Sequence, residues 1–126
     1  DTAGKTLSEK PFFLRTITDN RTPAQQKLYD RVSAKMTSPT AFGFLAHAYD
    51  GMNLLGLAIK QANSTDGDKV RLALENLDGT YEGAMKTYTK PFSASVHDAL
   101  LVGDYKWAHW QDGKLVPYAD DVTAAK

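Results

Sequence analysis

The sequence predicts an α/β fold, and three patterns lead to this prediction. Apolar residues recur at helical spacing in three segments between Pro23 and Leu77, and capping or turn residues bound these segments. Short β-favouring runs lie on both sides of them, and Asp112-Gly113 separates two such runs as in a β-hairpin. With 126 residues, 42% of them hydrophobic, the chain suits one compact domain with a modest core.

The first strand and the first helix are expected close together. Residues 1–10 are polar and are predicted to form a loop, whereas Phe12–Ile17 is an apolar, β-favouring run and is predicted to be a strand. Thr22 is the expected N-cap of the helix that follows, and Gln25 completes a capping box with it. This helix is expected to end before residues 38–39, Ser-Pro.

The second helix, predicted over residues 40–62, is apolar on almost every side. Such a helix is expected to be buried on most of its surface. Gly43, Gly51 and Gly56 interrupt it, and each glycine costs a helix about 1 kcal/mol relative to alanine. We therefore expect another backbone, or a ligand, to approach the helix closely at these positions.

The remaining segments end with a β-rich third of the chain. A third helix is predicted after the loop 63–67 and is expected to end at 78–79, Asp-Gly. A strand is predicted over 85–89, and a hairpin is predicted from the runs 104–110 and 115–118. These strands are too few for a doubly wound sheet, so something else is expected to cover the second helix.

Charge and composition exclude several functions. Lys plus Arg is 15 and Asp plus Glu is 15, and this neutral balance argues against nucleic acid or an anionic membrane surface as a partner. The absence of cysteine excludes disulfides, thiolate metal sites and cysteine nucleophiles. No apolar run approaches the ~20 residues of a membrane-spanning helix. The chain begins at Asp1 without methionine or a visible signal peptide, so we expect a trimmed or truncated product.

No pattern in the sequence indicates catalysis or a resident metal. The carboxylates are scattered without a paired arrangement, and no serine lies in a triad context. His47, His97 and His109 lack the spacing of metal ligands, and His109 alternates with Trp107 as packing residues of a strand do. We predict no enzyme activity, no catalytic residue, no metal and no cofactor.

One stretch resembles a known family of binding proteins. Residues 46–62, which contain Tyr49-Asp50-Gly51 and end in Ala-Ile-Lys-Gln-Ala, resemble the helix that opens with a Tyr-Asp-small pair in the leucine/isoleucine/valine-binding protein family. The resemblance covers most of the chain from Thr22 to Tyr118 and rests on the order and spacing of its parts. The other parts that match are the loop and helix 64–75, Tyr81-Glu82-Gly83 before a strand, His97-Asp98, and the Trp-rich hairpin with Asp112-Gly113-Lys114.

The resemblance implies a fold larger than this chain. Members of the family have two α/β lobes, joined by three crossings, and the ligand lies in the cleft between them. This chain would be the C-terminal portion of such a two-lobed type I periplasmic binding protein. Residues 1–21 would be the end of the second lobe and a crossing strand, 22–96 the first-lobe helices and strand, and 97–126 the return crossing, the second-lobe hairpin and the tail.

The resemblance also implies a function. The whole protein would be the periplasmic solute-binding component of an ABC importer, which binds an amino acid, amide or small organic acid and delivers it to the permease subunits. The alternative is a ligand-sensing regulatory or receptor domain of the same fold. Since this chain would carry one wall of the cleft, we expect it to bind ligand poorly by itself. We also expect the isolated chain to cover its apolar helix by forming a homodimer or a strand-swapped dimer.

Tyr49 and Asp50 are the predicted ligand-binding residues. The resemblance places the Tyr49 ring on the cleft, where an apolar ring with a polar tip suits an amino-acid or small-acid ligand. The alternative for Tyr49 is core packing, with its hydroxyl bonded to backbone. Asp50 would hold a cation or a hinge contact near the cleft, and its alternative is a solvated or helix-bonded aspartate.

Overall fold

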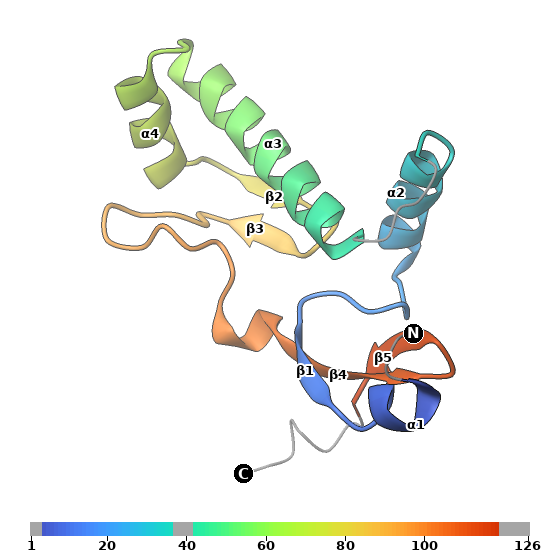
Figure 1. The fold of residues 1–126 in the computed structure, drawn as a ribbon. Coiled ribbons are helices and arrows are strands. Elements are labelled where there is room, and N and C mark those ends of the chain that lie inside the picture. The colour runs from blue at the N-terminus through green and yellow to red at the C-terminus, as the bar shows by residue number, and fades with distance from the viewer. Residues whose placement is uncertain (1–3, 37–41, 119–126) are drawn as a thin grey trace.

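The computed structural model describes residues 4–36 and 42–118 of the chain, and these residues form a mixture of helices and antiparallel strands (Figure 1). This mixture of helix and sheet is compatible with the α/β class predicted from the sequence. The elements are α1 (Gly4–Ser8), β1 (Phe12–Arg15), α2 (Pro23–Ser33), α3 (Phe42–Ala62), α4 (Gly67–Glu75), β2 (Thr80–Glu82), β3 (Thr87–Thr89), the 3₁₀ turn η1 (Val102–Asp104), β4 (Lys106–Gln111) and β5 (Lys114–Pro117).

The strands form two separate sheets. β1, β4 and β5 make a three-stranded sheet in the order β1-β4-β5, so the first strand of the chain pairs with the last hairpin. β2 and β3 make a two-stranded hairpin. In Figure 1 this hairpin lies beside α3 and α4, while α1 lies beside the three-stranded sheet at the other end of the molecule. The segments 16–22 and 90–105 join the two parts.

The start of α2 is the one the capping pattern predicts. Thr22 Oγ1 accepts a hydrogen bond from the Gln25 amide at 3.3 Å, and the Thr22 amide donates to Gln25 Oε1 at 3.0 Å, which completes the capping box. The helix ends earlier than expected, at Ser33. The expected boundary at residues 38–39 lies outside the described residues.

The prediction of a loop over residues 1–10 is wrong for its described part, because Gly4–Ser8 forms the short helix α1. Residues in and just after this helix form hydrogen bonds with the distant β4–β5 turn. Lys5 Nζ donates to Asp112 Oδ1 at 2.6 Å, and the Asp112 amide donates to Glu9 Oε1 at 2.8 Å. These partners lie more than a hundred residues away, so the local polar pattern did not indicate them.

The two hairpins differ in how well the sequence predicted them. At the β4–β5 turn, Asp112 and Gly113 both have positive φ, 49° and 75°, as expected for this turn dipeptide. The other hairpin was expected only as a strand over residues 85–89. Its β3 strand begins later, at Thr87, since Met85 belongs to the turn Gly83–Lys86, in which the Gly83 amide donates to the Lys86 carbonyl at 3.0 Å.

One side of α3 forms the core of the helical part. A stripe at four-residue spacing is buried, and it packs in two clusters against α2, α4 and the β2–β3 hairpin. The cluster near the C-terminal end of α3 includes Val70, Leu77 and Tyr88, and the cluster near its start includes Leu28 and Ala84. The buried stripe of α3 consists of Phe42, Ala46, Asp50, Leu54 and Ala58.

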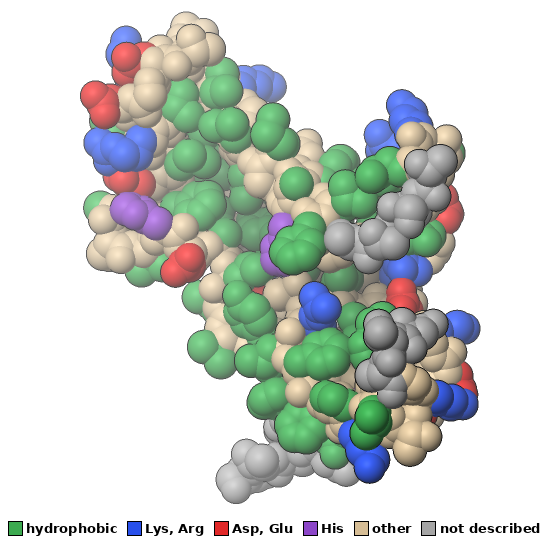
Figure 2. Space-filling model, in the orientation of Figure 1, with side chains coloured by type: hydrophobic (Ala, Val, Ile, Leu, Met, Phe, Trp, Pro, Cys, Tyr) green, Lys and Arg blue, Asp and Glu red, His purple; other side chains and the backbone are tan. Residues whose placement is uncertain are grey.

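The other side of α3 is not covered by the described residues, contrary to the expectation of a helix buried on most sides. The side chain of Phe44 is 73% exposed and that of Met52 is 67% exposed. A methyl group added at Gly51 or Gly56 would meet no atom within 4 Å. Figure 2 shows hydrophobic side chains on the visible surface of this part of the molecule. Nothing else in the described chain supplies the cover that the sequence led us to expect.

A buried carboxylate connects α3 to the β2–β3 hairpin. Asp50 is 1% exposed. Its Oδ1 accepts from the Ala84 amide at 2.7 Å, and its Oδ2 accepts from the Met85 amide at 2.8 Å. These amides belong to the middle of the hairpin turn, where no strand partner is available, so Asp50 provides acceptors that the turn otherwise lacks. The Tyr88 hydroxyl donates to Oδ2 at 3.1 Å and the Tyr81 hydroxyl lies 3.4 Å from Oδ1.

The same turn is also bonded to α2. The buried side chain of Gln25 donates from Nε2 to the Ala84 carbonyl at 3.1 Å. The amide of Ala84 is held by α3 and its carbonyl by α2, so this one peptide segment ties three elements together. Gln25 therefore has two roles, because its Oε1 caps α2 while its Nε2 holds the hairpin.

Gly83 is required for this arrangement. A Cβ at Gly83 would lie 2.6 Å from Asp50 Oδ2 and 2.7 Å from Tyr88 Cε2. Both distances are too short for any side chain, and both contacted groups are buried and engaged. The position therefore accepts only glycine unless the carboxylate moves away from the turn amides.

We predict opposite effects for alanine at two glycines. Gly83→Ala should lower the free energy of unfolding by about 1–3 kcal/mol, as overpacking of a filled core does. Gly51→Ala, on the open face of α3, should raise it by about 0.5–1 kcal/mol, because alanine is the better helix former. Urea unfolding followed by circular dichroism measures both. Equal effects of the two substitutions would contradict the role given to Gly83.

Candidate functional site

A cavity of about 580 Å³ lies where the helical part meets the three-stranded sheet. The segment 14–19, which follows from β1, forms one wall. Tyr29 of α2 and the first turns of α3 form the second wall, and Tyr105, Trp110 and Leu115 from the C-terminal third complete it. The cavity therefore has walls from segments that are far apart in the sequence.

Two close contacts hold the segment after β1 against α3. A hydrogen bond of 2.7 Å joins Thr16 Oγ1 and His47 Nε2. Next to it, a Cβ at Gly43 would lie 3.3 Å from Ile17 Cγ2, which is tighter than ordinary van der Waals contact. The close neighbour at Gly43 is therefore a side chain, and not the backbone or ligand that the sequence led us to expect. No described atom comes within 4 Å of a Cβ placed at Gly51 or Gly56.

Asp19 and Arg21 form a joint at one end of the cavity. Asp19 bonds both backbone polar groups of Leu115 in β5. Its amide donates to the Leu115 carbonyl at 2.7 Å, and its Oδ2 accepts from the Leu115 amide at 2.8 Å. Asp19 Oδ1 accepts from Arg21 Nη2 at 2.6 Å. The Arg21 guanidinium in turn lies 4.0 Å from the ring centre of Tyr29 and 5.2 Å from that of Phe42. The sheet and the helices are linked here through two neighbouring side chains.

A second linkage holds the segment 90–105, which leads from β3 back to the three-stranded sheet. Lys86, just before β3, donates to the Ala99 carbonyl at 3.2 Å and to Asp104 Oδ2 of η1. Asp104 Oδ2 also accepts from the Leu101 amide at 2.7 Å. The hydrogen bond from Lys86 holds the pKa of Asp104 below its usual range. The segment that leads back to the sheet is therefore fixed by a partly buried ion pair.

The two predicted ligand-binding residues lie away from this cavity. Tyr49 is 38% exposed, and its carbonyl accepts from Asn53 Nδ2 at 2.7 Å. Neither Tyr49 nor Asp50 lines the cavity. The alternative of a solvated Asp50 is wrong, because the carboxylate is buried and engaged by the hairpin. Ligand binding by these two residues stays a prediction.

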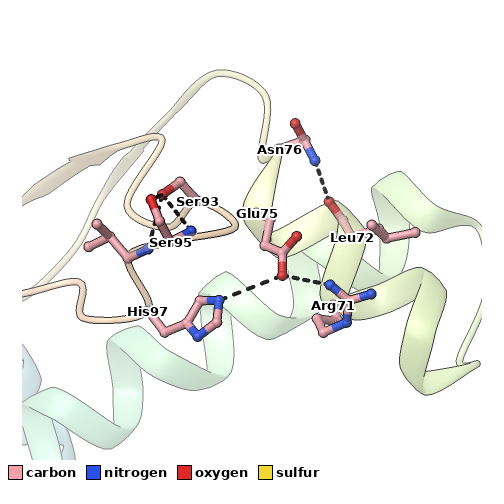
Figure 3. A network of polar contacts seen from close by, with 8 residues as sticks. Arg71, Leu72, Glu75, Asn76, Ser93, Ser95 and His97 are labelled. Atoms are coloured by element: carbon pink, nitrogen blue, oxygen red, sulfur yellow. Dashed lines mark hydrogen bonds and ion pairs between the residues drawn. The ribbon is translucent and has the colours of Figure 1, made fainter.

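The three histidines lie in different surroundings. His47 lines the cavity, and the His109 ring packs edge-on against Tyr118 at 5.5 Å, as expected for a strand residue. His97 lies beside α4, where its Nε2 is 3.6 Å from Glu75 Oε1 (Figure 3). The Glu75 side chain is only 8% exposed and also accepts from Arg71 Nη1 at 2.7 Å. This contact holds the 90–101 loop beside α4.

The described residues contain neither a cluster of metal ligands nor a membrane-spanning helix. Over residues 4–36 and 42–118, no group of three or more histidine, aspartate or glutamate side chains is arranged to hold a metal ion. None of the helices in this part of the chain is long and apolar enough to cross a membrane. The described cavity walls offer aromatic and aliphatic side chains, hydroxyl groups, an imidazole, two guanidinium groups and the Asp19 carboxylate.

Comparison with known proteins adds no assignment. No protein-family model, curated protein or solved structure matches the chain. Sequence reasoning did not identify this set of lining residues as a site, and the residues it missed include Arg15, Thr16, Ile17, Asp19, Arg21, Phe44, His47, Tyr105 and Trp110.

A weak signal for the missed residues existed in the sequence. His47 is a polar residue one turn inside an apolar helix, and Thr16 is a hydroxyl at the end of an apolar strand. Either feature alone is common in ordinary packing. The hydrogen bond between them spans 31 positions, so no local spacing could bring them together.

The tyrosines around Asp50 have altered acidity. Burial, and then the charge of Asp50, raise the pKa of Tyr81 to about 12. The same causes, in the same order, raise the pKa of Tyr88 well above that of free tyrosine. Both hydroxyls are therefore held as donors to the carboxylate.

We predict that alkaline pH weakens the fold through these tyrosines. An unfolded tyrosine ionises near pH ~10, whereas folded Tyr81 stays neutral until about 12. Their contribution to stability is complete below pH ~10 and is lost as the pH rises from there toward 12. NMR of ring-labelled tyrosine, with Tyr81→Phe to assign the signal, measures the folded pKa. A Tyr81 signal that titrates like free tyrosine would contradict the contact with Asp50.

Proposed function

We propose that this chain is the C-terminal portion of an extracytoplasmic solute-binding protein of the two-lobed type I periplasmic fold. The whole protein binds an amino acid, amide or small organic acid between its lobes and delivers it to the permease subunits of an ABC importer. The work consists of binding and closure, and no bond is broken. The resemblance of residues 22–118 to the leucine/isoleucine/valine-binding family motivates this proposal.

The pairing of distant strands supports the proposed division of the chain. Residues 1–21 and 97–126 were both assigned to the second lobe and its crossings, although they are the two ends of the chain. In the structure β1 pairs with β4, in the register Phe13↔Ala108. The residues between them, 22–96, contain α2, α3, α4 and the β2–β3 hairpin, which match the first-lobe segment of the proposal.

The observation that carries the proposal is the position of the cavity. It lies between the two parts, at the place where the chain passes from one to the other, as an interlobe ligand site does. Its volume of about 580 Å³ lies in the range of ~300–1,000 Å³ that small-molecule sites occupy. It also combines apolar rings with a few polar groups, as such sites do.

The test is an NMR titration of the labelled chain with millimolar concentrations of branched-chain and aromatic amino acids, amides and acids. We expect weak binding that shifts the amide signals of 16–17 and 42–47. His47→Ala should weaken it about fivefold, which corresponds to ~1 kcal/mol for one lost hydrogen bond. His97→Ala, which lies outside the cavity, is the matched control and should leave it unchanged. The proposal fails if no solute shifts the cavity signals.

We further propose that the isolated chain pairs with a second copy through the uncovered face of α3. The exposed side chains Phe44 and Met52 form an apolar surface with the open glycines beside them. In the whole importer protein, the missing part of the lobe would occupy this face instead.

Sedimentation equilibrium at micromolar concentration tests this pairing. The wild-type chain should sediment as a dimer, and Met52→Glu should shift it toward monomer because a charge cannot be buried unpaired. Val102→Glu changes another exposed apolar residue, which lies on η1 away from α3, and should leave the dimer intact. A folded wild-type monomer would contradict the pairing.

A further inference from the structure

We propose that the cavity selects solutes that carry a carboxylate on an apolar body, and that an ammonium group contributes nothing to binding by the described walls. This inference rests on the proposed solute-binding function and names the substrate class for the same cavity. It follows from the balance of charged and hydrogen-bonding groups on the cavity walls.

The cavity has no carboxylate available for a cation among its described lining residues. Asp19 is the acidic residue in the lining, and both of its oxygens are engaged. Oδ1 accepts from Arg21 at 2.6 Å and Oδ2 accepts from the Leu115 amide at 2.8 Å. Each oxygen could accept a second hydrogen bond, but Arg21 already balances the charge of Asp19, so an ammonium ligand would meet no net negative charge on these walls.

Cationic and donor groups are present in excess. Arg15 lines the cavity, and its guanidinium lies 5.2 Å from the ring centre of Phe13 with no ion-pair partner among the described residues. Arg21 is neutralised by Asp19, so Arg15 leaves the lining with a net positive charge. A guanidinium binds a carboxylate with two parallel hydrogen bonds, which is the strongest polar contact this set of groups can offer.

The start of α3 adds to the preference for an anion. Phe42, Gly43 and Phe44 line the cavity, so the first turn of a 21-residue helix faces it. The helix dipole places partial positive charge at this end, which favours a negative group nearby. The dipole supports the selection that Arg15 makes and does not replace it.

The rest of the lining is suited to an apolar body. Leu14, Ile17, Phe44, Tyr105 and Trp110 surround the polar groups. Several of these side chains remain partly exposed in this structure, so a branched or aromatic group could bury them further. A purely polar anion, such as phosphate, would leave these surfaces exposed.

A matched series of ligands tests the inference. 4-Methylpentanoate, 4-methylpentanamide and 3-methylbutylamine share one branched body and differ in the polar end. In the NMR titration at neutral pH and fixed ionic strength, we expect the carboxylate to bind roughly tenfold tighter than the amide, and the amine to be weakest. Binding of the amide or the amine as tight as the carboxylate would overturn the inference and leave the solute-binding function standing. If no member shifts the cavity signals, and no other solute does, the proposed function fails as well.

Two variants locate the selecting group. Arg15→Gln should weaken the carboxylate roughly tenfold and leave the amide unchanged, because only the charged end loses its partner. Lys114→Gln removes a positive charge from β5 outside the cavity and should change neither ligand. An equal loss of both ligands in Arg15→Gln would show that Arg15 is merely structural, and unchanged carboxylate binding would assign the selection elsewhere; either result overturns the role of Arg15.

Discussion

The hydrogen bonds of the Asp50 carboxylate with the turn of the β2–β3 hairpin are the contact on which the helical part depends. A carboxylate buried to this extent is costly unless its oxygens accept several hydrogen bonds. Here two turn amides and two tyrosine hydroxyls supply them. The turn gains partners for amides that the strands cannot pair, and α3 is fixed at one rotation about its axis. Gly83 leaves the space in which this happens.

The rotation of α3 about its axis determines which of its side chains contact the segment after β1 and which are exposed. With Asp50 turned toward the hairpin, His47 lies about one turn earlier and meets Thr16 of the segment that follows β1. The same rotation turns Phe44 and Met52 outward. One buried polar contact therefore determines both the cavity at the start of the helix and the apolar surface that nothing in the described chain covers.

The cavity is lined both by polar side chains that hold the fold together and by side chains whose charge or apolar surface has no partner among the described residues. Asp19 and Arg21 satisfy one another and join the sheet to the helices, so they serve the frame rather than a ligand. Arg15 lacks such a partner among the described residues, and the surrounding rings lack cover. A small anion with an apolar body complements both. Arg15 and Arg21 are thus close in the sequence but differ in their contacts, since Arg21 is paired with Asp19 and Arg15 has no ion-pair partner among the described residues.

The sequence by itself determined the elements whose signals are local. The Thr22–Gln25 capping box, the extent of α3 to Ala62 and the Asp112-Gly113 hairpin all follow from interactions within a few residues. Only the tertiary structure decided the roles of polar side chains, because their partners lie far away in the chain. Asp50 and Tyr49 were both predicted to bind a ligand, and the structure shows that the Asp50 carboxylate is bonded to a turn 34 positions later in the chain. The burial of a polar group and the identity of its partner are properties of the packed chain, and no spacing within one helix encodes them.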